Sequence, residues 1–484
     1  MRTIWYMGAK TRLTGEILSA VRAASPRARR VLDLMSGTAA VAHSLSPHYE
    51  VVANDVQAYA TTIAAAYLAA DEARGDYLAA LDPVRDLGRA FRQNQDALLE
   101  RLGPAIAVED AFLGAYGLEP DTPDPLADGQ VLAERGVGGR SPRRRLPNAP
   151  ADRARAYRDF ALQQTPTFLE ERDTIAAGPF RPAADLFRHA TIESRRRDPR
   201  AAPYLLASSY YLNVYLGLRQ AIAVDSLRYA IDALRGPHAL AKRRHYLAAL
   251  LHAASVTTSA TSHFCQPRGL VRDSEVKAVL VRRSLSIPSK TIAFSRSIAE
   301  TVRGTSFRGP NAARQGSWRD TYAAWEAIQA DVVYVDPPYT ADNYSRFYHV
   351  LEVLTAYDYP RLHMRRCKTT KGRYPELALR YRSPFCIRSG VEQEVRDLVH
   401  ETARRGAGLV FSYGEENGLL LKTWREAGDS RPGALRRLAD LAREAYGEVE
   451  LNKKSLLHSG QGDSNKQITE LLLVARKPRR RLRA

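Results

Sequence analysis

Short apolar runs alternate with helical patterns at both ends of this chain, and no other feature limits its fold as strongly. The predicted strands are residues 30–37, 49–56, 331–336, 408–413, 448–452 and 468–476. Helical patterns lie between them, for example at residues 11–24 and 391–405. Because strands that alternate with helices form sheets covered on both faces, we predict an α/β fold with a mainly parallel, doubly wound sheet.

The middle of the chain has a different composition. Residues 71–299 are rich in alanine, leucine and arginine, and stretches such as 217–234 have a helical pattern. Within this region, residues 119–155 are crowded with proline, glycine and charge, which predicts a mobile loop. We therefore expect one α/β domain, residues 1–70 and 300–484, split by a mostly helical insertion at residues 71–299.

The net charge of the chain indicates which class of partner it binds. Its 484 residues include 72 Lys and Arg against 53 Asp and Glu, a formal net charge of +19. Such an excess predicts a polyanionic partner, either nucleic acid or an anionic membrane surface. No apolar run resembles a membrane span or a signal peptide, and the three cysteines have neither disulfide nor zinc-site spacing. We expect a soluble cytoplasmic protein without a metal.

Two early strands end in polar residues that suit a cofactor. Asp33 closes the first strand before a small-residue bend that contains Gly37, and Asn54 and Asp55 close the next strand. A carboxylate at the second position can accept hydrogen bonds from ribose hydroxyls. The spacing also fits a nicotinamide dinucleotide, but pyrophosphate sites are usually richer in glycine. The bend therefore favours a cofactor without phosphates, with an ordinary strand–turn–helix as the alternative.

Residues 332–344, VVYVDPPYTADNY, begin as a buried strand and then break at Asp336. Pro337 and Pro338 fix φ near −65° and hold a rigid turn, so that a carboxylate and a carbonyl form an acceptor pair suited to an exocyclic NH2 group. Tyr339 offers a flat face on which a ring can stack. We predict that this motif grips an aromatic amine and positions it for attack. A strand-ending turn with a packing tyrosine is the alternative.

These motifs resemble, in sequence and order, those of the Dam-like (alpha-group) N6-adenine DNA methyltransferases. The matched residues are Tyr6, Gly8 and Lys10 near the N-terminus, Asp33 to Ala39 in the cofactor loop, Asp320 before the catalytic strand, and Asp336, Pro337, Pro338 and Tyr339 in the catalytic motif. The resemblance covers about residues 1–70 and 300–484. Met35 and Ala39 stand where the family usually has Phe and Gly.

The resemblance implies a Rossmann-like fold and a site-specific enzyme that transfers a methyl group from S-adenosylmethionine (AdoMet) to the N6 amine of adenine in double-stranded DNA. The implied cofactor-binding residues are Tyr6, Gly8, Lys10, Asp33, Ser36, Gly37, Asn54, Asp55 and Asp320. Lys10 is expected near the methionine carboxylate and Asp320 near the cofactor's adenine. We expect a monomer, and a cognate restriction or phage-defence system is compatible with the family.

The insertion is the expected target-recognition region. Gln266 and Arg268 are candidate donors to base edges and phosphates, and Arg143, Arg144 and Arg145 are candidate phosphate contacts. No Pro-Cys dipeptide is present, which disfavours cytosine C5 chemistry. Methylation of cytosine N4 or of RNA remains an alternative, as does a non-catalytic DNA-binding protein that retains the AdoMet fold.

Overall fold

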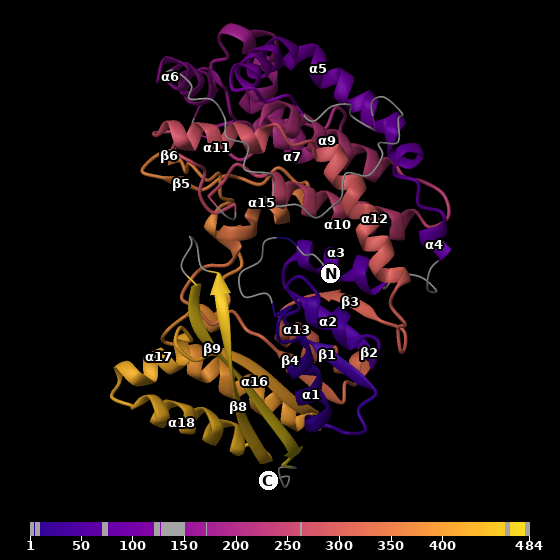
Figure 1. The fold of residues 1–484 in the computed structure, drawn as a ribbon, viewed down its shortest axis with the longest axis vertical. Coiled ribbons are helices and arrows are strands. Elements are labelled where there is room, and N and C mark those ends of the chain that lie inside the picture. The colour runs from indigo at the N-terminus through magenta and orange to yellow at the C-terminus, as the bar shows by residue number, and fades with distance from the viewer. Residues whose placement is uncertain are drawn as a thin grey trace.

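The computed structural model describes residues 4, 10–69, 76–120, 126, 151–170, 172–261, 264–459 and 465–479. These residues form two lobes, one built from helices and one built around a sheet (Figure 1). Most of the loop predicted at residues 119–155 lies outside the described residues.

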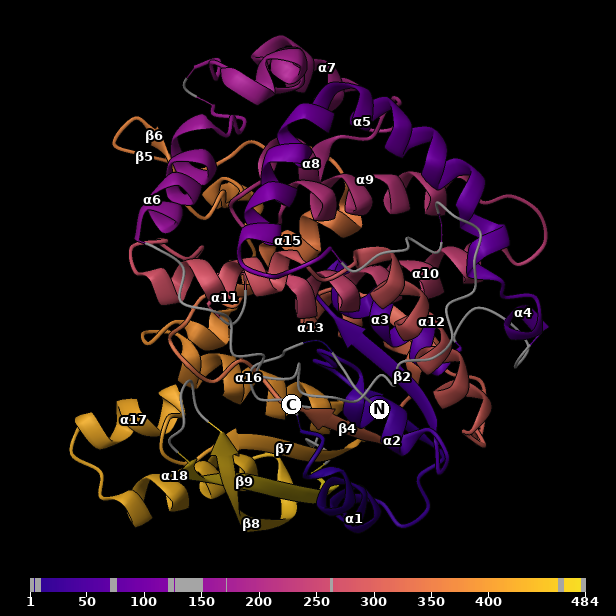
Figure 2. The ribbon, with the colours of Figure 1, turned by 45° about the horizontal axis from the view of Figure 1, so that its top comes forward.

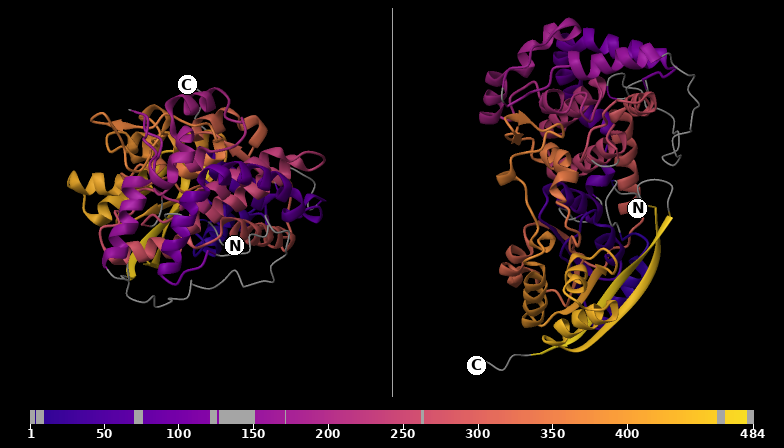
Figure 3. Two further views of the ribbon diagram at one scale, coloured as in Figure 1. Left: turned by 90° about the horizontal axis from the view of Figure 1, so that it is seen from above. Right: turned by 90° about the vertical axis from the view of Figure 1, so that its left-hand side faces the viewer.

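Among the described residues, a seven-stranded sheet has the order β3-β2-β1-β4-β7-β9-β8. Its strands are β1 (Arg30–Asp33), β2 (Glu50–Asp55), β3 (Ala312–Gln315), β4 (Val332–Val335), β7 (Gly408–Gly414), β8 (Tyr446–Ser459) and β9 (Asn465–Pro478). The strands from β3 to β7 are parallel, whereas β9 is antiparallel to both of its neighbours. The long β8–β9 hairpin forms one edge of the sheet lobe (Figure 3, right). The predicted mainly parallel α/β fold is confirmed.

The order of the strands creates a topological switch point. The chain runs outward from β1 through β2 to β3 and then starts again at β4, on the other side of β1. Val31 accordingly pairs with Val51 on one side and with Val332 on the other. Ligands of open α/β sheets bind outside the carboxyl ends of the strands at such a point.

The two faces of the sheet are both covered. Val31 and Val332 pack into one core, whereas Leu32 and Val333 pack into another on the opposite face. The first core includes α1 (Thr14–Ala24) and α2 (Ala40–Leu45), and the second includes α13 (Trp318–Ala323), α16 (Val391–Arg404), α17 (Leu419–Glu426) and α18 (Arg431–Arg443). The short α14 (Trp325–Ile328) lies next to β4 in the chain. Burial on both faces explains why the central strands are continuous apolar runs.

The helical lobe has its own hydrophobic core. Its helices are α4 (Asp76–Ala79), α5 (Pro83–Ala115), α6 (Ala151–Asp159), α7 (His189–Arg197), α8 (Leu206–Tyr210), α9 (Leu218–Ala233), α10 (Ala239–Thr257), α11 (Asp273–Arg283) and α12 (Ile287–Arg303). In the part of the chain that the structure describes, no helix combines the length and apolar character needed to cross a membrane.

Two helices from outside residues 71–299 belong to this core as well. They are α3 (Ala58–Leu68), which follows β2, and α15 (Ser345–Ala356), which follows the Asp-Pro-Pro-Tyr motif. The Glu352 carboxylate of α15 accepts hydrogen bonds from the backbone N–H groups of Ala58, at 2.9 Å, and Tyr59, at 3.1 Å. The first turn of α3 is thereby tied to α15, so the helical lobe is joined to the strand ends of the sheet.

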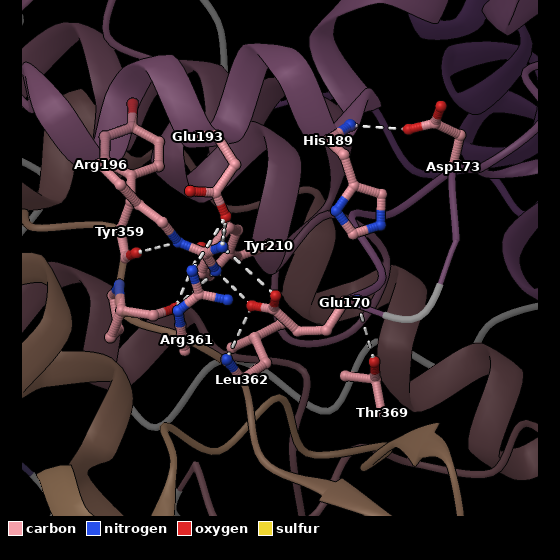
Figure 4. Close-up of polar contacts among 11 residues, drawn as sticks. Glu170, Asp173, His189, Glu193, Arg196, Tyr210, Tyr359, Arg361, Leu362 and Thr369 are labelled. Atoms are coloured by element: carbon pink, nitrogen blue, oxygen red, sulfur yellow. Dashed lines mark hydrogen bonds and ion pairs between the residues drawn. The ribbon is translucent and has the colours of Figure 1, made fainter.

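A small hairpin follows α15 and projects at the edge of the helical lobe (Figure 2). It consists of β5 (Met364–Arg365) and β6 (Lys368–Thr369). A buried charge network fixes the chain just before it (Figure 4). Arg196 pairs with Glu170 and donates to the carbonyl of Tyr359 at 2.9 Å, while Glu170 accepts from the backbone N–H of Leu362 at 2.8 Å.

Candidate active site

A pocket with about 1040 Å³ of empty space, including its open mouth, lies at the carboxyl ends of β1, β2 and β4. It is therefore at the switch point of the sheet, on the side that faces α15. Its walls come from residues 34–38, 54–57, 316–318 and 336–339, with Lys10, Ala40, Val41, Tyr344, Ser345, Tyr381, Ser383 and Cys386. The pocket brings together the cofactor motif and the Asp-Pro-Pro-Tyr motif, which are about 300 residues apart in the chain.

Asp55 organises the turn on one side of the pocket. Its carboxylate accepts hydrogen bonds from the backbone N–H groups of Gly37 and Gln57, both at 2.9 Å. Gly37 has a φ of +50°, in the left-handed region that glycine adopts without strain. Burial raises the pKa of Asp55, and the two backbone N–H groups act in the opposite direction. The turn is thus held around a carboxylate that borders the pocket.

Three buried oxygens near this turn have no hydrogen-bond partner among the described residues. They are Asp33 Oδ1, Ser36 Oγ and Asn54 Oδ1. The other oxygen of Asp33 accepts from the N–H of Ala42 at 3.0 Å. Asn54 donates to the carbonyls of Leu34 and Gly316, both at 3.0 Å, and so connects the ends of β1 and β3. Buried polar atoms without partners are rare in native proteins and indicate a ligand or water at this position.

Asp336 is also part of the pocket wall, and Lys10 forms an ion pair with it. The Lys10 ammonium lies 2.9 Å from Asp336 Oδ1 and 3.2 Å from Glu470 Oε1, and it lies 5.2 Å from the centre of the Tyr339 ring. Burial raises the pKa of Asp336 to about 6, against the opposing effect of Lys10. Although burial acts to lower the pKa of Lys10, Asp336 and Glu470 raise it well above its ordinary value. Lys10 therefore remains a cation between the two carboxyl groups.

Tyr339 is half-buried between the pocket and β7. Its ring lies 5.5 Å from that of Tyr413, and its carbonyl accepts a hydrogen bond from the N–H of Leu419 at 2.7 Å. A Cβ atom at Gly414 would lie only 2.9 Å from this ring. Glycine at the end of β7 therefore allows the ring to take its place beside the pocket.

Comparisons with known proteins agree with this geometry. The family model described as "D12 class N6 adenine-specific DNA methyltransferase" matches residues 6–96 and 314–399. The chain is similar to this family over these two segments. The two matched segments contain both groups of pocket residues, and the unmatched residues between them make up most of the helical lobe.

Two curated relatives match parts of the chain. "Modification methylase LlaI" from Lactococcus lactis subsp. lactis is 23% identical over 272 residues, which are 54% of this chain and 37% of the relative. "Type II methyltransferase M.FokI" from Planomicrobium okeanokoites is 32% identical over 103 residues, which are 21% of this chain and 14% of the relative. The chain thus spans well under half the length of either relative. No solved structure matches it.

The structure describes only some of the other site residues that the sequence predicts. Tyr6, Gly8, Arg143, Arg144 and Arg145 are outside the described residues. Lys10, expected near a methionine carboxylate, lines the pocket and contacts Asp336 and Glu470, and its predicted role stays a prediction.

Asp320 lies beside the pocket rather than in its wall. Its carboxylate accepts hydrogen bonds from the Ser317 N–H at 3.0 Å and hydroxyl at 2.6 Å, which lower its pKa. These bonds cap the first turn of α13.

The loop that contains Gln266 and Arg268 packs against α15. The N–H of Phe264 donates to the carbonyl of Phe347 at 3.2 Å, and the carbonyl of Cys265 accepts a hydrogen bond from Tyr374. Gln266 is exposed and Arg268 is half-buried. The loop therefore lies next to the helix whose first residue, Ser345, lines the pocket.

Several pocket residues were not found from the sequence. Tyr381 and Cys386 reach the pocket from a segment without regular motifs, and Cys386 donates weakly to the carbonyl of Pro338 at 3.6 Å. Burial raises the pKa of Cys386 to about 12, so its thiol stays protonated. Glu470, which contacts Lys10 but is not part of the pocket wall, had a detectable signal, because it is the one acidic residue of β9 and directly precedes the apolar run Leu471–Ala475. Among the described residues, no group of His, Cys, Asp or Glu is arranged to hold a metal ion.

Proposed function

We propose that this protein is a site-specific DNA methyltransferase that transfers a methyl group from AdoMet to the N6 amine of adenine. One observation carries the proposal. A single pocket is bordered by Asp55 on one side and by Asp336, Pro337, Pro338 and Tyr339 on the other. A cofactor and a flipped base would therefore meet in one space, as transfer between them requires.

The pocket fits AdoMet by the chemistry of its walls. Asp55 has the lone pairs to accept hydrogen bonds from ribose hydroxyls, in addition to its two backbone donors. The partnerless oxygen of Ser36 in the wall, and that of Asp33 behind it, are acceptors for the amino group at the methionine end. Trp318 supplies an aromatic wall for the adenine ring. AdoMet supplies an electrophilic methyl group when it is bound.

The protein's own part in the reaction is to hold the amine. Asp336 and the carbonyl of Pro337 accept hydrogen bonds from its two hydrogens, which makes the nitrogen lone pair available for in-line attack. Tyr339 stacks on the ring of the base. The Lys10 ammonium lies 2.9 Å from Asp336 Oδ1 and favours the ionised form of this carboxyl group, because a nearby cation stabilises its negative charge.

The N6 amine of an adenine inside a duplex cannot enter such a pocket, so the base has to be flipped out of the helix. We propose that the helical lobe, joined to the pocket through α3 and α15, contains the surface that selects the target sequence. Its loop with Gln266 and Arg268 lies against α15 and is the first candidate for DNA contact. The names of the relatives, a modification methylase and a type II methyltransferase, favour a restriction–modification setting.

Methylation of DNA by the full-length chain tests the proposal. DNA is incubated with the protein and AdoMet that carries a labelled methyl group, and the modified bases are then identified and located by sequencing. We expect N6-methyladenine at one fixed sequence, and none with the Asp336→Ala variant. N4-methylcytosine as the product would reassign the base, label found in RNA alone would reassign the substrate, and DNA binding without label would indicate a non-catalytic protein.

A further inference from the structure

Two arginines converge on one buried tyrosine, Tyr374. The guanidinium carbons of Arg346 and Arg380 lie 5.3 Å and 5.7 Å from the centre of the Tyr374 ring. Tyr374 is buried, its hydroxyl donates to the carbonyl of Cys265, and its ring lies 4.8 Å from that of His349. The ring is therefore a fixed platform that holds two cations close together.

The positive charge of this pair is not neutralised. Neither Arg346 nor Arg380 forms an ion pair with an acidic residue in the described part of the chain, and Arg380 Nε is buried there without an acceptor. Burial and the neighbouring Arg346 both lower the pKa of Arg380. Burial lowers the pKa of His349 to about 4, so this ring is neutral and adds no further charge. The like charges of the exposed Arg346 and the half-buried Arg380 repel each other, and an anion bound between them would remove this repulsion.

Both arginines are next in the chain to residues of the pocket wall. Arg346 directly follows Ser345 in the chain and Arg380 directly precedes Tyr381, and both Ser345 and Tyr381 line the pocket. The adjoining residues 361–373 contain six Lys and Arg and no Asp or Glu. The basic side chains of Arg365, Arg366 and Lys368 on the hairpin are exposed. The segment between the two arginines in the chain is therefore basic as well, which suits a polyanionic partner.

We propose that Arg346 and Arg380 form a preformed site for one phosphate group of the DNA backbone, next to the nucleotide that enters the pocket. Guanidinium groups bind phosphate through paired N–H donors, and the phosphate would satisfy the buried Arg380 Nε and remove the repulsion between the cations. The inference rests on the proposed function only in naming DNA as the source of the phosphate. The other anion available at the pocket is the carboxylate of the cofactor.

The salt dependence of DNA binding tests the site without relying on catalysis. The full-length protein and an Arg346→Gln/Arg380→Gln variant are titrated with a short duplex of mixed sequence at several salt concentrations. Loss of one phosphate contact should reduce the slope of log K against log salt by about 0.9. The matched control is Arg436→Gln, an exposed arginine on α18, which should leave the slope unchanged. An unchanged slope in the double variant would overturn the proposal.

Two further measurements keep the outcome clear. AdoMet affinity, measured by calorimetry, should be the same in the double variant and the wild type. Loss of that affinity with an unchanged salt slope would assign the pair to the cofactor carboxylate and overturn the proposal. The thermal midpoint should not fall, because the substitutions remove a repulsion. Failure of the wild type to methylate DNA would refute the proposed function, but it would not affect the binding slopes.

If the double variant does not fold, the phosphate groups of the DNA can be altered instead of the protein. After the methylated sequence is known, single phosphates beside the target adenine are replaced by neutral methylphosphonates. We expect one position at which this replacement weakens DNA binding by the wild type. At the same position, the replacement should weaken DNA binding by the single variants Arg346→Gln and Arg380→Gln to a smaller extent. If no position shows this dependence, the two arginines do not share a phosphate near the target base.

Discussion

Asp55 has two roles in the proposed complex, one in holding the turn and one in binding the cofactor, and a substitution at this residue tests the second. It holds the N–H groups of Gly37 and Gln57 and, in the proposed complex, it also accepts from the ribose. Asp55→Asn keeps the size of the side chain but removes its charge. We expect AdoMet affinity to fall by about 1.5–3 kcal/mol, the value of a hydrogen bond to a charged group. Calorimetry on the folded variant measures this, and unchanged affinity would refute the ribose role.

The pH dependence of methyl transfer reports on Asp336. Burial raises the pKa of this carboxyl group to about 6, in a site where Lys10, Glu470, Tyr339, Tyr334 and Asp33 surround it. Only the ionised carboxylate accepts a hydrogen bond through both oxygens, so protonation removes the working form. The single-turnover rate should therefore fall as the pH drops through about 6. A rate that stays constant down to pH 5 would contradict this assignment.

Some residues of the candidate site could be predicted from the sequence alone. Asp33, Asp55 and Asp336 could be found because each closes an apolar strand, and parallel strands bring such positions to one edge of the sheet. Asp320 has the residue type expected for the cofactor's adenine, but the same type caps a helix, and the structure gives it that contact. The contact between Lys10 and Glu470 depends on tertiary packing that spacing in the chain does not encode.

The chain that leads into the β5–β6 hairpin is held by a buried ion pair between Arg196 and Glu170. Arg196 and Glu170 are 11% and 8% exposed, and they join α7 to the chain between α15 and β5 (Figure 4). Glu170→Ala removes the buried partner of Arg196 and leaves it only the more exposed Glu193, which we expect to reduce the free energy of unfolding by up to about 3–5 kcal/mol. Thermal or denaturant unfolding measures this. The control is Asp185→Ala, whose partner Arg101 is 42% exposed and whose loss should cost at most about 1 kcal/mol.

The elements that the sequence missed share a physical cause. β3 has the sequence AARQ and lies at the edge of the sheet, where its residues are only partly buried, so it has no apolar run. β5 and β6 have two residues each, and the turn between them uses Arg366 and Cys367 at positive φ instead of the usual Asn-Gly. By contrast, β4 is buried at all four residues and β7 at all seven, and both were predicted.

At the scale of the whole molecule, the two lobes are joined through shared elements. α3 and α15 belong to the helical core, yet they begin at the pocket, and Glu352 ties one to the other. We expect the lobes to unfold together and bound AdoMet to raise the midpoint of that single transition, because a ligand that binds only the folded state stabilises it. Calorimetric scans with and without AdoMet test this. Two transitions, of which AdoMet shifts only one, would show that the lobes are independent.

The central claim is that Asp336 holds the amine that receives the methyl group. The most direct test is single-turnover methyl transfer to DNA by the wild type and Asp336→Ala, with DNA affinity measured on the same samples. We predict that transfer collapses in the variant while DNA affinity is retained, because one of the two acceptors for the amine is lost but the stacking surface of Tyr339 remains. Methyl transfer by Asp336→Ala at the wild-type rate would contradict the mechanism and reduce the motif to a structural turn.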